Sequence, residues 1–523
     1  MSVVAYPASR MPDVTRTSAH LRPRIPRYLT FASWLVCVCL MGLVGSVLGP
    51  GWNPQPMAQM VVPETSDTSV STASATPSLG TYRVTTSLEK VHLRDGSVVT
   101  AELKRPVGAG ENLPAMVFIH GTGTNGYDAF ERETSLIASA GVVTLTPQKR
   151  VDNYSNTYRD YYALADDYED ALEHLREDEG VDARRVGIYA VSEGCFIAPI
   201  IAARNHDVAF VAFISAPVIP IRFQGAFASD AYLREIGAPV ELRRAIPKLM
   251  GQEFGDGTFQ YIDFDPSPFE AQMTMPVFMA YGTLDNSMPM IQGPTIMRDQ
   301  LAKADNHALT VRYYKNADHG LQTNRKALDK HAMRDIATWV NGLPFSATAS
   351  PHVAGATPQQ EFQAAAFQIG ARGTAGPAAV WVLVGGVGLI VVGGLLGLAT
   401  LIRRRGRRLG SFRGAGAATA WGSVFSVVSW VALFAYLLVV VYIATHYEQN
   451  LWAVRGGWLV VRVLALLAVW FMVSACVHWV TGRRRNPATS AGPLAVIAFG
   501  TSILGQFLLL LALGYWNVLP ALF

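Results

Sequence analysis

Five long apolar stretches constrain the fold of this chain more than any other feature of its sequence. Each has about 20 or more mostly uncharged residues, the length that a helix needs to cross the hydrocarbon core of a bilayer. Only 16% of the 523 residues are charged, and this deficit is concentrated near the N-terminus and after residue 377. The sequence therefore predicts about five transmembrane helices, at roughly 28–49, 378–402, 418–445, 457–480 and 493–516.

Clusters of arginine predict how these spans are oriented. Arginines gather in the tail 1–27, in the stretch 403–413 and at 483–485, and each cluster borders an apolar stretch. Cytoplasmic loops of membrane proteins carry an excess of Lys and Arg. Five alternating spans put all three clusters on the cytoplasmic side, whereas the outer loop 446–456 holds only Arg455. We therefore expect a multi-pass plasma-membrane protein with a cytoplasmic N-terminus and an extracytoplasmic central module.

The segments around the central module have a different character. The stretch 28–49 is either an uncleaved anchor or a signal peptide, since it has a basic start and ends near small residues. Its apolar run is long for a signal peptide and favours the anchor, and both interpretations leave the module outside. Residues 50–80 are rich in Ser, Thr and Pro, and 346–377 look similar. We expect both to be flexible, exposed linkers, followed by a four-helix transmembrane domain at 378–523.

Between the linkers, residues 81–345 alternate short β-rich runs with helical ones. Arg94-Asp95-Gly96 predicts a hairpin turn. Strands separated by helices predict an α/β domain with a mainly parallel sheet and helices on both faces. Residues 217–270 interrupt this alternation, and we expect a lid insertion over the end of the sheet. The expected sheet strands lie at 115–120, 142–146, 186–191, 209–214, 277–281 and 309–314.

Ser192 is the candidate nucleophile. It follows the apolar strand 186–191 and precedes a helical run, so a sharp turn would hold its hydroxyl at the positive end of a helix. Such a turn needs small residues two positions to each side, and Ala190 and Gly194 supply them. The alternative is a serine that only caps the helix.

A serine needs a base, and the base needs an acid that fixes its tautomer. His319 lies in a loop after the last predicted strand, where an imidazole could reach Ser192. Asp285 follows the strand 277–281 and is the preferred acid. Asp318 is the alternative acid, but a neighbour in sequence generally points away from the imidazole. The sequence therefore predicts a Ser192, Asp285 and His319 triad.

An oxyanion hole needs backbone N–H groups directed at the developing charge. One should come from Glu193, directly after the nucleophile. The other should come from the loop after the strand 115–120, through Thr122 or Gly121. We expect His120 in the same loop to be structural, because His319 already fills the role of the base.

These motifs resemble those of the α/β-hydrolase superfamily. Residues 82–345 are similar to dienelactone hydrolases and to the catalytic domains of prolyl-oligopeptidase-type peptidases. The resemblance covers about half of the chain and implies a serine hydrolase, but the superfamily includes esterases, lipases, thioesterases, peptidases and acyltransferases. Cys195 stands where related proteins often have glycine, and its thiol could be modified there. The matching pieces are His120-Gly121, Val181-Asp182, Arg185-Val186, Ser192-Glu193-Gly194, the run 281–285 and Asp318-His319-Gly320.

The leading hypothesis is a membrane-anchored, extracytoplasmic acyl hydrolase of the esterase or lipase kind, or an acyltransferase. Its substrate would be an acyl ester or lipid-like molecule beside the bilayer. One alternative is a serine peptidase of the prolyl-oligopeptidase type. The other is a non-catalytic membrane sensor or assembly protein that uses the module to bind a ligand.

No cofactor, metal or nucleic acid is expected, since the sequence has no CxxC or Cys/His spacing and no groove-reading motif. The C-terminal helices could bind a membrane protein partner. Gly393 and Gly397 predict close packing of their helix against a neighbour. Arg462 lies a few residues inside the fourth span, and we expect its guanidinium to reach the membrane interface rather than form an intramembrane site.

Overall fold

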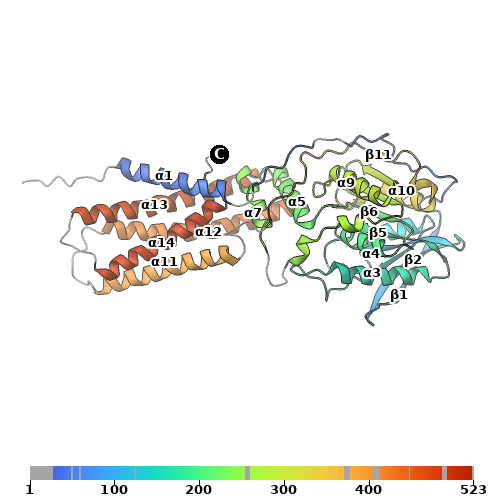
Figure 1. Ribbon diagram of the computed structural model, residues 1–523, viewed down its shortest axis with the longest axis horizontal. Coiled ribbons are helices and arrows are strands. Elements are labelled where there is room, and N and C mark those ends of the chain that lie inside the picture. The colour runs from blue at the N-terminus through green and yellow to red at the C-terminus, as the bar shows by residue number, and fades with distance from the viewer. Residues whose placement is uncertain are drawn as a thin grey trace, which may run out of the picture.

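The computed structural model has a helical bundle at one end and an α/β domain at the other (Figure 1). The tail 1–26 and most of the arginine-rich stretch 403–413 lie outside the described residues. The structure describes residues 27–48, 51–57, 61–123, 125–253, 259–324, 326–369, 377–403, 413–446, 448–485 and 492–520.

The α/β domain is built on one nine-stranded sheet in the order β1-β2-β4-β3-β5-β6-β7-β8-β11. Only β1 with β2 and β2 with β4 pair antiparallel, and the other neighbours are parallel. The mainly parallel sheet is thus confirmed. The strands are β1 (Arg83–His92), β2 (Val98–Val107), β3 (Leu113–Ile119), β4 (Val143–Pro147), β5 (Val181–Val191), β6 (Val211–Ile214), β7 (Val277–Gly282), β8 (Leu309–Tyr314) and β11 (Val353–Gly355).

Helices cover both faces of this sheet, as expected for strands that are buried on both sides. On one face, α3 (Tyr161–Arg176), α4 (Gly194–Arg204) and α9 (Gln292–Leu301) pack in one apolar core. On the other face, α2 (Glu131–Ala138) and α10 (Lys330–Asn341) form a second core around Trp339. Both cores pack against the short central strands, whose carboxyl ends precede the candidate catalytic residues. A small hairpin of β9 (Gln322–Thr323) and β10 (Ala327–Leu328) follows β8.

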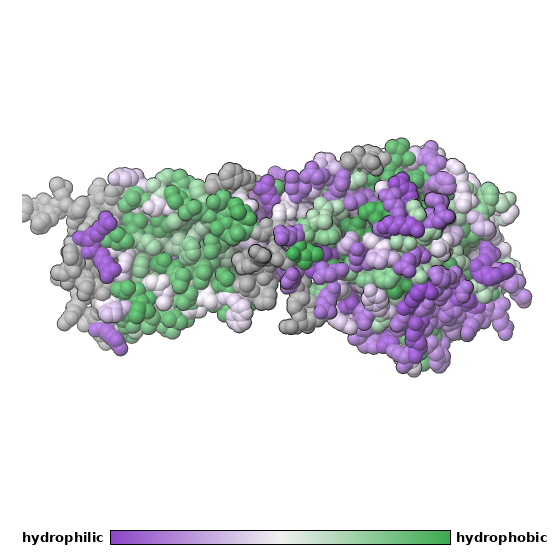
Figure 2. All heavy atoms as spheres, in the orientation of Figure 1, coloured by the Kyte–Doolittle hydropathy of each residue, from purple (hydrophilic) through white to green (hydrophobic). Residues whose placement is uncertain are grey.

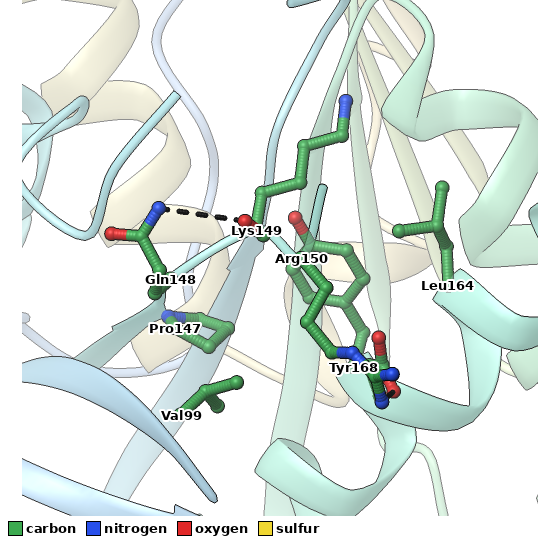
Figure 3. Close-up of a pocket in the computed structure, with 8 residues that line it drawn as sticks. Val99, Pro147, Gln148, Lys149, Arg150, Leu164 and Tyr168 are labelled. Carbon is green, nitrogen blue, oxygen red and sulfur yellow. Dashed lines mark hydrogen bonds and ion pairs between the residues drawn. The ribbon is translucent and has the colours of Figure 1, made fainter. Parts of the chain in front are cut away.

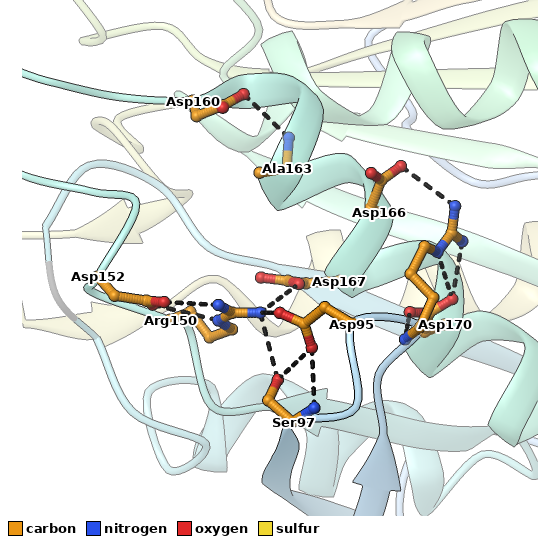
Figure 4. A network of polar contacts seen from close by, with 10 residues as sticks. Asp95, Ser97, Arg150, Asp152, Asp160, Ala163, Asp166, Asp167 and Asp170 are labelled. Carbon is orange, nitrogen blue, oxygen red and sulfur yellow. Dashed lines mark hydrogen bonds and ion pairs between the residues drawn. The ribbon is translucent and has the colours of Figure 1, made fainter.

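The predicted β1–β2 hairpin is present, and its turn is fixed to α3 by ion pairs (Figure 4). Arg94 pairs with Asp166 and Asp170 of α3 at 3.2 and 2.7 Å. Arg150 pairs with Asp95 of the turn at 2.5 Å and with Asp167 of α3 at 3.3 Å. These contacts occupy the carboxylates with guanidinium groups, so the cluster braces the edge of the sheet.

Among the described residues, five helices are long and apolar enough to cross a membrane. The first, α1, packs against α13 and α14 and so joins the four C-terminal helices, rather than standing apart as a separate anchor (Figure 1). A Cβ on Gly45 would lie 2.1 Å from the carbonyl oxygen of Gly514, which shows how closely α1 approaches α14. The helices are α1 (Arg27–Val47), α11 (Pro377–Arg403), α12 (Arg413–Thr445), α13 (Gly457–Arg485) and α14 (Pro493–Tyr515), with a short π-helix, η4 (Trp452–Gly456), before α13.

Small residues bring α11 and α14 together. A Cβ on Gly393 would lie 2.2 Å from Ser502 Oγ, and one on Gly386 would lie 3.3 Å from the carbonyl oxygen of Gly505. The expected close packing is therefore correct for Gly393. It is wrong for Gly397, whose Cβ would have no described atom within 4 Å. The contact repeats every seven residues, along the face of α11 that Gly386 and Gly393 share.

The insertion 217–270 lies between the sheet and the bundle (Figure 1). It leaves the sheet after β6 and returns at β7, and its apolar residues Ile236, Ala238 and Leu242 belong to the same core as the membrane helices. The insertion is therefore the layer that joins the two parts of the molecule, and its role as a lid stays a prediction. Its helices are α5 (Ile221–Glu235), α6 (Val240–Arg243), α7 (Ile246–Met250), η1 (Gln260–Asp263) and α8 (Ser267–Glu270).

Polar contacts strengthen this junction. Lys248 Nζ donates to the carbonyl oxygens of Gly45 and Tyr515 at 2.5 and 2.7 Å. Arg462 Nη2 lies 3.0 Å from Glu241 Oε1, and its Nε donates to the carbonyl oxygen of Val518. The carboxylate that pairs with Arg462 thus belongs to the insertion and not to another membrane span. The expectation that its guanidinium reaches the membrane interface stays a prediction.

The two expected linkers are not free tethers where the structure describes them. Val353 to Gly355 form β11 beside β8, and η3 (Phe345–Ala347) precedes that strand. The carboxylate of Glu64 accepts hydrogen bonds from the N–H groups of His352 and Val353. Segments with no hydrophobic period of their own are thus ordered by adding to an existing sheet edge, which sequence periodicity does not report.

Figure 2 shows that hydrophobic surface covers the bundle, whereas hydrophilic residues dominate the α/β domain. Exposed side chains on the bundle include Trp381, Val431 and Leu438. Large exposed apolar surface marks contact with a membrane or partner. The surface agrees with the five candidate membrane spans.

Candidate active site

Ser192 lies in the sharp turn between β5 and α4 that the motif predicts. Its φ of 53° is in the left-handed region, which costs a non-glycine residue about 1–3 kcal/mol and persists only where the surroundings enforce it. Its N–H donates to the carbonyl oxygen of Ile214 at 2.9 Å. A Cβ on Gly194 would lie 2.7 Å from the carbonyl oxygen of Ile119, so the turn needs the small residue found there.

Cys195 lies behind this turn rather than beside the hydroxyl. Its Sγ donates to the carbonyl oxygen of Ala190 at 3.3 Å, and the side chain is buried. Burial raises the pKa of the thiol well above its ordinary value. The expectation that this thiol could be modified is therefore not supported, since the group is protonated and enclosed.

His319 and Asp285 form the expected pair. His319 Nδ1 lies 3.0 Å from Asp285 Oδ2, so the acid at the base is Asp285 rather than Asp318. Burial alone would raise the pKa of Asp285, but the charge of His319 and several hydrogen bonds hold it below its ordinary value. Burial lowers the pKa of His319, and the carboxylate of Asp285 outweighs this effect, so that the pKa is raised.

Two serines that the sequence analysis missed complete this pair. Ser287 Oγ donates to Asp285 Oδ1 at 2.6 Å and lies 3.2 Å from His319 Nδ1. Ser215 directly follows β6 with a φ of 52°, hydrogen-bonds to the Asp285 carboxylate, and accepts from the N–H of Gly320 at 3.2 Å. The sequence offers one signal for each of them: Ser215 directly follows a strand, and Ser287 lies two residues after Asp285.

The groups of the predicted triad meet at one edge of the sheet. Ser192, Asp285 and His319 follow the carboxyl ends of β5, β7 and β8. Among the described residues, no hydrogen bond joins the Ser192 hydroxyl to His319. Such contacts often tighten only when substrate binds, so the link between nucleophile and base stays a prediction.

The predicted oxyanion loop lies against the nucleophile. A Cβ on Gly121 would lie 3.3 Å from Ser192 Cβ and 3.9 Å from Ser192 Oγ, so the loop backbone reaches the reacting atom. Thr122 is next in the same loop. Glu193 precedes α4, where the first amides of a helix have no intrahelical acceptor. Gly121 and Glu193 are thus adjacent to Ser192, and the use of the Thr122 amide stays a prediction.

His120 has the structural role that was expected. Its side chain is fully buried, Nδ1 lies 2.6 Å from Tyr168 OH, and Nε2 lies 2.9 Å from the carbonyl oxygen of Gly126. Because that carbonyl can only accept, Nε2 carries the proton and Nδ1 accepts from the tyrosine. Burial lowers the pKa of His120 to about 4, so it stays neutral and shapes the turn.

The side chain of Glu193 has a set of partners that sequence reasoning also missed. Its carboxylate is 3% exposed and accepts from Tyr154 OH at 2.7 Å and Tyr161 OH at 2.8 Å. It also pairs with Arg159, and Lys149 Nζ lies 3.4 Å from Oε2. Two cations and two phenols therefore hold one carboxylate directly after the nucleophile.

Two cavities lie near these groups. Figure 3 shows the first, between β4 and α3, with Lys149 extending away from Val99 and Pro147. Its volume of about 10 Å³ is enough for about one water molecule and no substrate. The second, of about 340 Å³, adjoins Asp285 and is walled by α5, the loop after β7 and residues 359–362. It has the size of a small-molecule pocket.

In the described part of the chain, no group of three or more His, Cys, Asp or Glu side chains is placed to hold an ion.

Part of the chain matches a known protein family. Residues 128–343 match the sequence profile of the prolyl oligopeptidase family. No significant sequence match was found among curated proteins. The structure is similar to a putative dienelactone hydrolase from Klebsiella pneumoniae, with 18% identity, a TM-score of 0.35, and coverage of 51% of this chain and 100% of that chain.

Two further similar structures are known enzymes. An esterase from Pyrobaculum calidifontis has 17% identity and a TM-score of 0.37, over 60% of this chain and 92% of that one. Dipeptidyl peptidase 4 from Porphyromonas gingivalis has 13% identity and a TM-score of 0.36, over 50% of this chain and 35% of that one. The family match, the strand order and the turn at Ser192 together support a serine hydrolase of the α/β-hydrolase type, joined to five candidate membrane helices.

Proposed function

We propose that this protein is a membrane-anchored serine hydrolase that acts outside the membrane on acyl esters or transfers their acyl groups. The observation that carries the proposal is the strained Ser192 turn at the same sheet edge as the hydrogen-bonded Asp285–His319 pair. A strained nucleophile together with an oriented imidazole is what acyl transfer needs.

The chemistry follows from the two nitrogens of His319. Nδ1–H donates to Asp285, which leaves Nε2 as the base for the Ser192 proton. Ser192 Oγ then bonds to the acyl carbon, and the carbonyl oxygen becomes an oxyanion between the N–H groups of Glu193 and the loop at Thr122. Collapse breaks the bond to the leaving alcohol, which takes the proton from His319. Water or an acceptor hydroxyl then attacks the acyl-enzyme with the same base.

The position of the site supports a lipid-like or envelope-derived ester. The insertion 217–270 that borders the site also packs against the membrane helices, so a substrate held near the bilayer could reach it. Peptide hydrolysis is the second candidate, favoured by the match of residues 128–343 to the prolyl oligopeptidase family. A panel of p-nitrophenyl esters and aminoacyl anilides distinguishes the two activities.

Labelling with a fluorophosphonate probe tests the assignment. The wild-type protein should react, and Ser192→Ala should not. Ser87→Ala on exposed β1 is the matched control and should label like wild type. Labelling that persists in Ser192→Ala would refute the nucleophile, whereas a folded wild type that never labels would favour the non-catalytic sensor.

A further inference from the structure

In the turn Gly121-Thr122-Gly123 after β3, the structure shows one amide that is occupied and two that are not. The N–H of Gly123 donates to Tyr154 OH at 2.9 Å and is therefore occupied. In the described structure, the N–H groups of Gly121 and Thr122 have no acceptor, and Gly121 lies against Ser192. Within this turn, these two amides are the donors that a substrate oxygen could still use.

Lys149 holds the peptide unit between these two residues. Its Nζ donates to the carbonyl oxygen of Gly121 at 2.8 Å. In a planar trans peptide, the C=O of one residue and the N–H of the next point in opposite directions. Because Lys149 fixes the Gly121 oxygen on its own side, the N–H of Thr122 is turned away from the ammonium group.

The same ammonium group connects this loop to the other expected donor. Lys149 Nζ also lies 3.4 Å from Glu193 Oε2, and Tyr154 OH, which accepts from Gly123, donates to the same oxygen. Both contacts run from the loop to the residue whose N–H should form the other side of the oxyanion hole. The separation between the two sides is thus set by Lys149, Tyr154 and Glu193.

The ion pair between Lys149 and Glu193 is buried, and stability alone does not explain it. The side chain of Lys149 has no exposed area and that of Glu193 is 3% exposed. Taking both charges out of water has a desolvation cost that the attraction between them often fails to offset. Well-packed apolar residues of similar volume are often at least as stabilising as a buried ion pair, which favours a role of this pair in fixing geometry.

We propose that Lys149 and Tyr154 are positioning residues that hold the Thr122 and Glu193 amides at the spacing of an oxyanion, through the Gly121 carbonyl and the Glu193 carboxylate. This inference rests on the proposed function, since it assigns the parts of the same hydrolytic site. It also makes the Glu193 side chain, and not only its amide, part of the machinery.

Lys149→Met tests the proposal in the full-length protein in detergent micelles. Active sites are first titrated with the fluorophosphonate probe, so that kcat refers to reactive Ser192 only. Losing one oxyanion contact typically lowers kcat by about 10²–10³-fold, and we expect about 10²-fold here with KM nearly unchanged. The affinity for an aryl trifluoromethyl ketone, which forms a tetrahedral oxyanion on the serine, should fall by the same factor as kcat/KM.

Two further variants separate positioning from folding. Lys104→Met removes another buried lysine, which donates to the Glu131 carbonyl and to Ser135 far from the site. It should lower the melting temperature and leave kcat per titrated site at the wild-type value. Tyr154→Phe should lower kcat in the same way as Lys149→Met, and it keeps the proposal testable if that variant does not fold.

The outcomes are distinct. A normal kcat per titrated site in both Lys149→Met and Tyr154→Phe, with unchanged inhibitor affinity, would overturn this inference and leave the proposed function standing. A wild-type protein that shows no labelling at Ser192 would overturn both. A loss of kcat matched by the inhibitor affinity, with KM unchanged, supports the positioning role.

Discussion

The hydrogen bond between Asp285 and His319 sets the pH at which the proposed nucleophile can be activated. The neutral imidazole is the base, so activity is lost as the pH falls through the pKa of His319. Asp285 raises that pKa above its ordinary 6.5. We therefore expect the acid limb of kcat/KM, which reports the free enzyme, to lie above pH 6.5.

Asp285→Asn should move this limb to lower pH, because burial, which lowers the pKa of His319, then acts without the opposing charge. It should also lower kcat by about 10⁴-fold, as loss of the orienting carboxylate does in other triads. The measurement is kcat/KM for a p-nitrophenyl ester between pH 5 and 9. An acid limb at the same pH in both proteins would contradict the assignment of Asp285.

Local motifs were enough to place Ser192, Asp285 and His319 at one edge of the sheet, because each follows a strand whose pattern is visible in the sequence. Their catalytic roles stay predictions. The remaining partners were not accessible in this way. Ser215 reaches Asp285 from another strand, and the Glu193 carboxylate meets residues 32 to 44 positions away. Inspection of one sequence segment identifies the residue at the end of a strand. It does not show which side chains from other strands and helices contact that residue.

At the scale of elements, the insertion was predicted from the break in alternation, but its attachment was not. The segment 236–242 is too short to show a hydrophobic period, so its sequence does not indicate which hydrophobic core its apolar residues enter. Their partners are candidate membrane helices that are apolar on all sides. The sequence of such a helix does not show which of its faces contacts a neighbour. The same limit applies to 346–369, which gains order from the edge of β8 rather than from its own composition.

Lys248 provides a test of this attachment. Its Nζ donates to the carbonyl oxygens of Gly45 and Tyr515 and to Asn517 Oδ1. Lys248→Met leaves three acceptors without a donor, and each unsatisfied buried group costs about 1–3 kcal/mol. We expect faster hydrogen exchange in residues 239–253 and a lower melting temperature in detergent. Lys90→Met, an exposed lysine on β1, is the control, and equal exchange in both variants would contradict the role of Lys248.

At the scale of the whole molecule, the helix ends that carry arginine lie far from the α/β domain (Figure 1). α1 begins at Arg27, α11 ends at Arg403 and α13 ends at Arg485. The opposite ends of α1 and α14 contact the insertion through Lys248. A membrane around the bundle would therefore separate these helix ends from the candidate site, as the alternation of five spans requires.

This separation predicts the outcome of cysteine labelling in intact cells. Leu88→Cys on exposed β1 and Glu448→Cys in the loop after α12 should react with a membrane-impermeant maleimide. Arg484→Cys at the end of α13 should react only after the cells are permeabilised, because positive residues favour the cytoplasmic side. Replacing Cys37, Cys39 and Cys476 removes the cysteines of the membrane helices, and the remaining Cys195 is buried. The reverse pattern would place the α/β domain in the cytoplasm and would exclude extracytoplasmic esters as substrates.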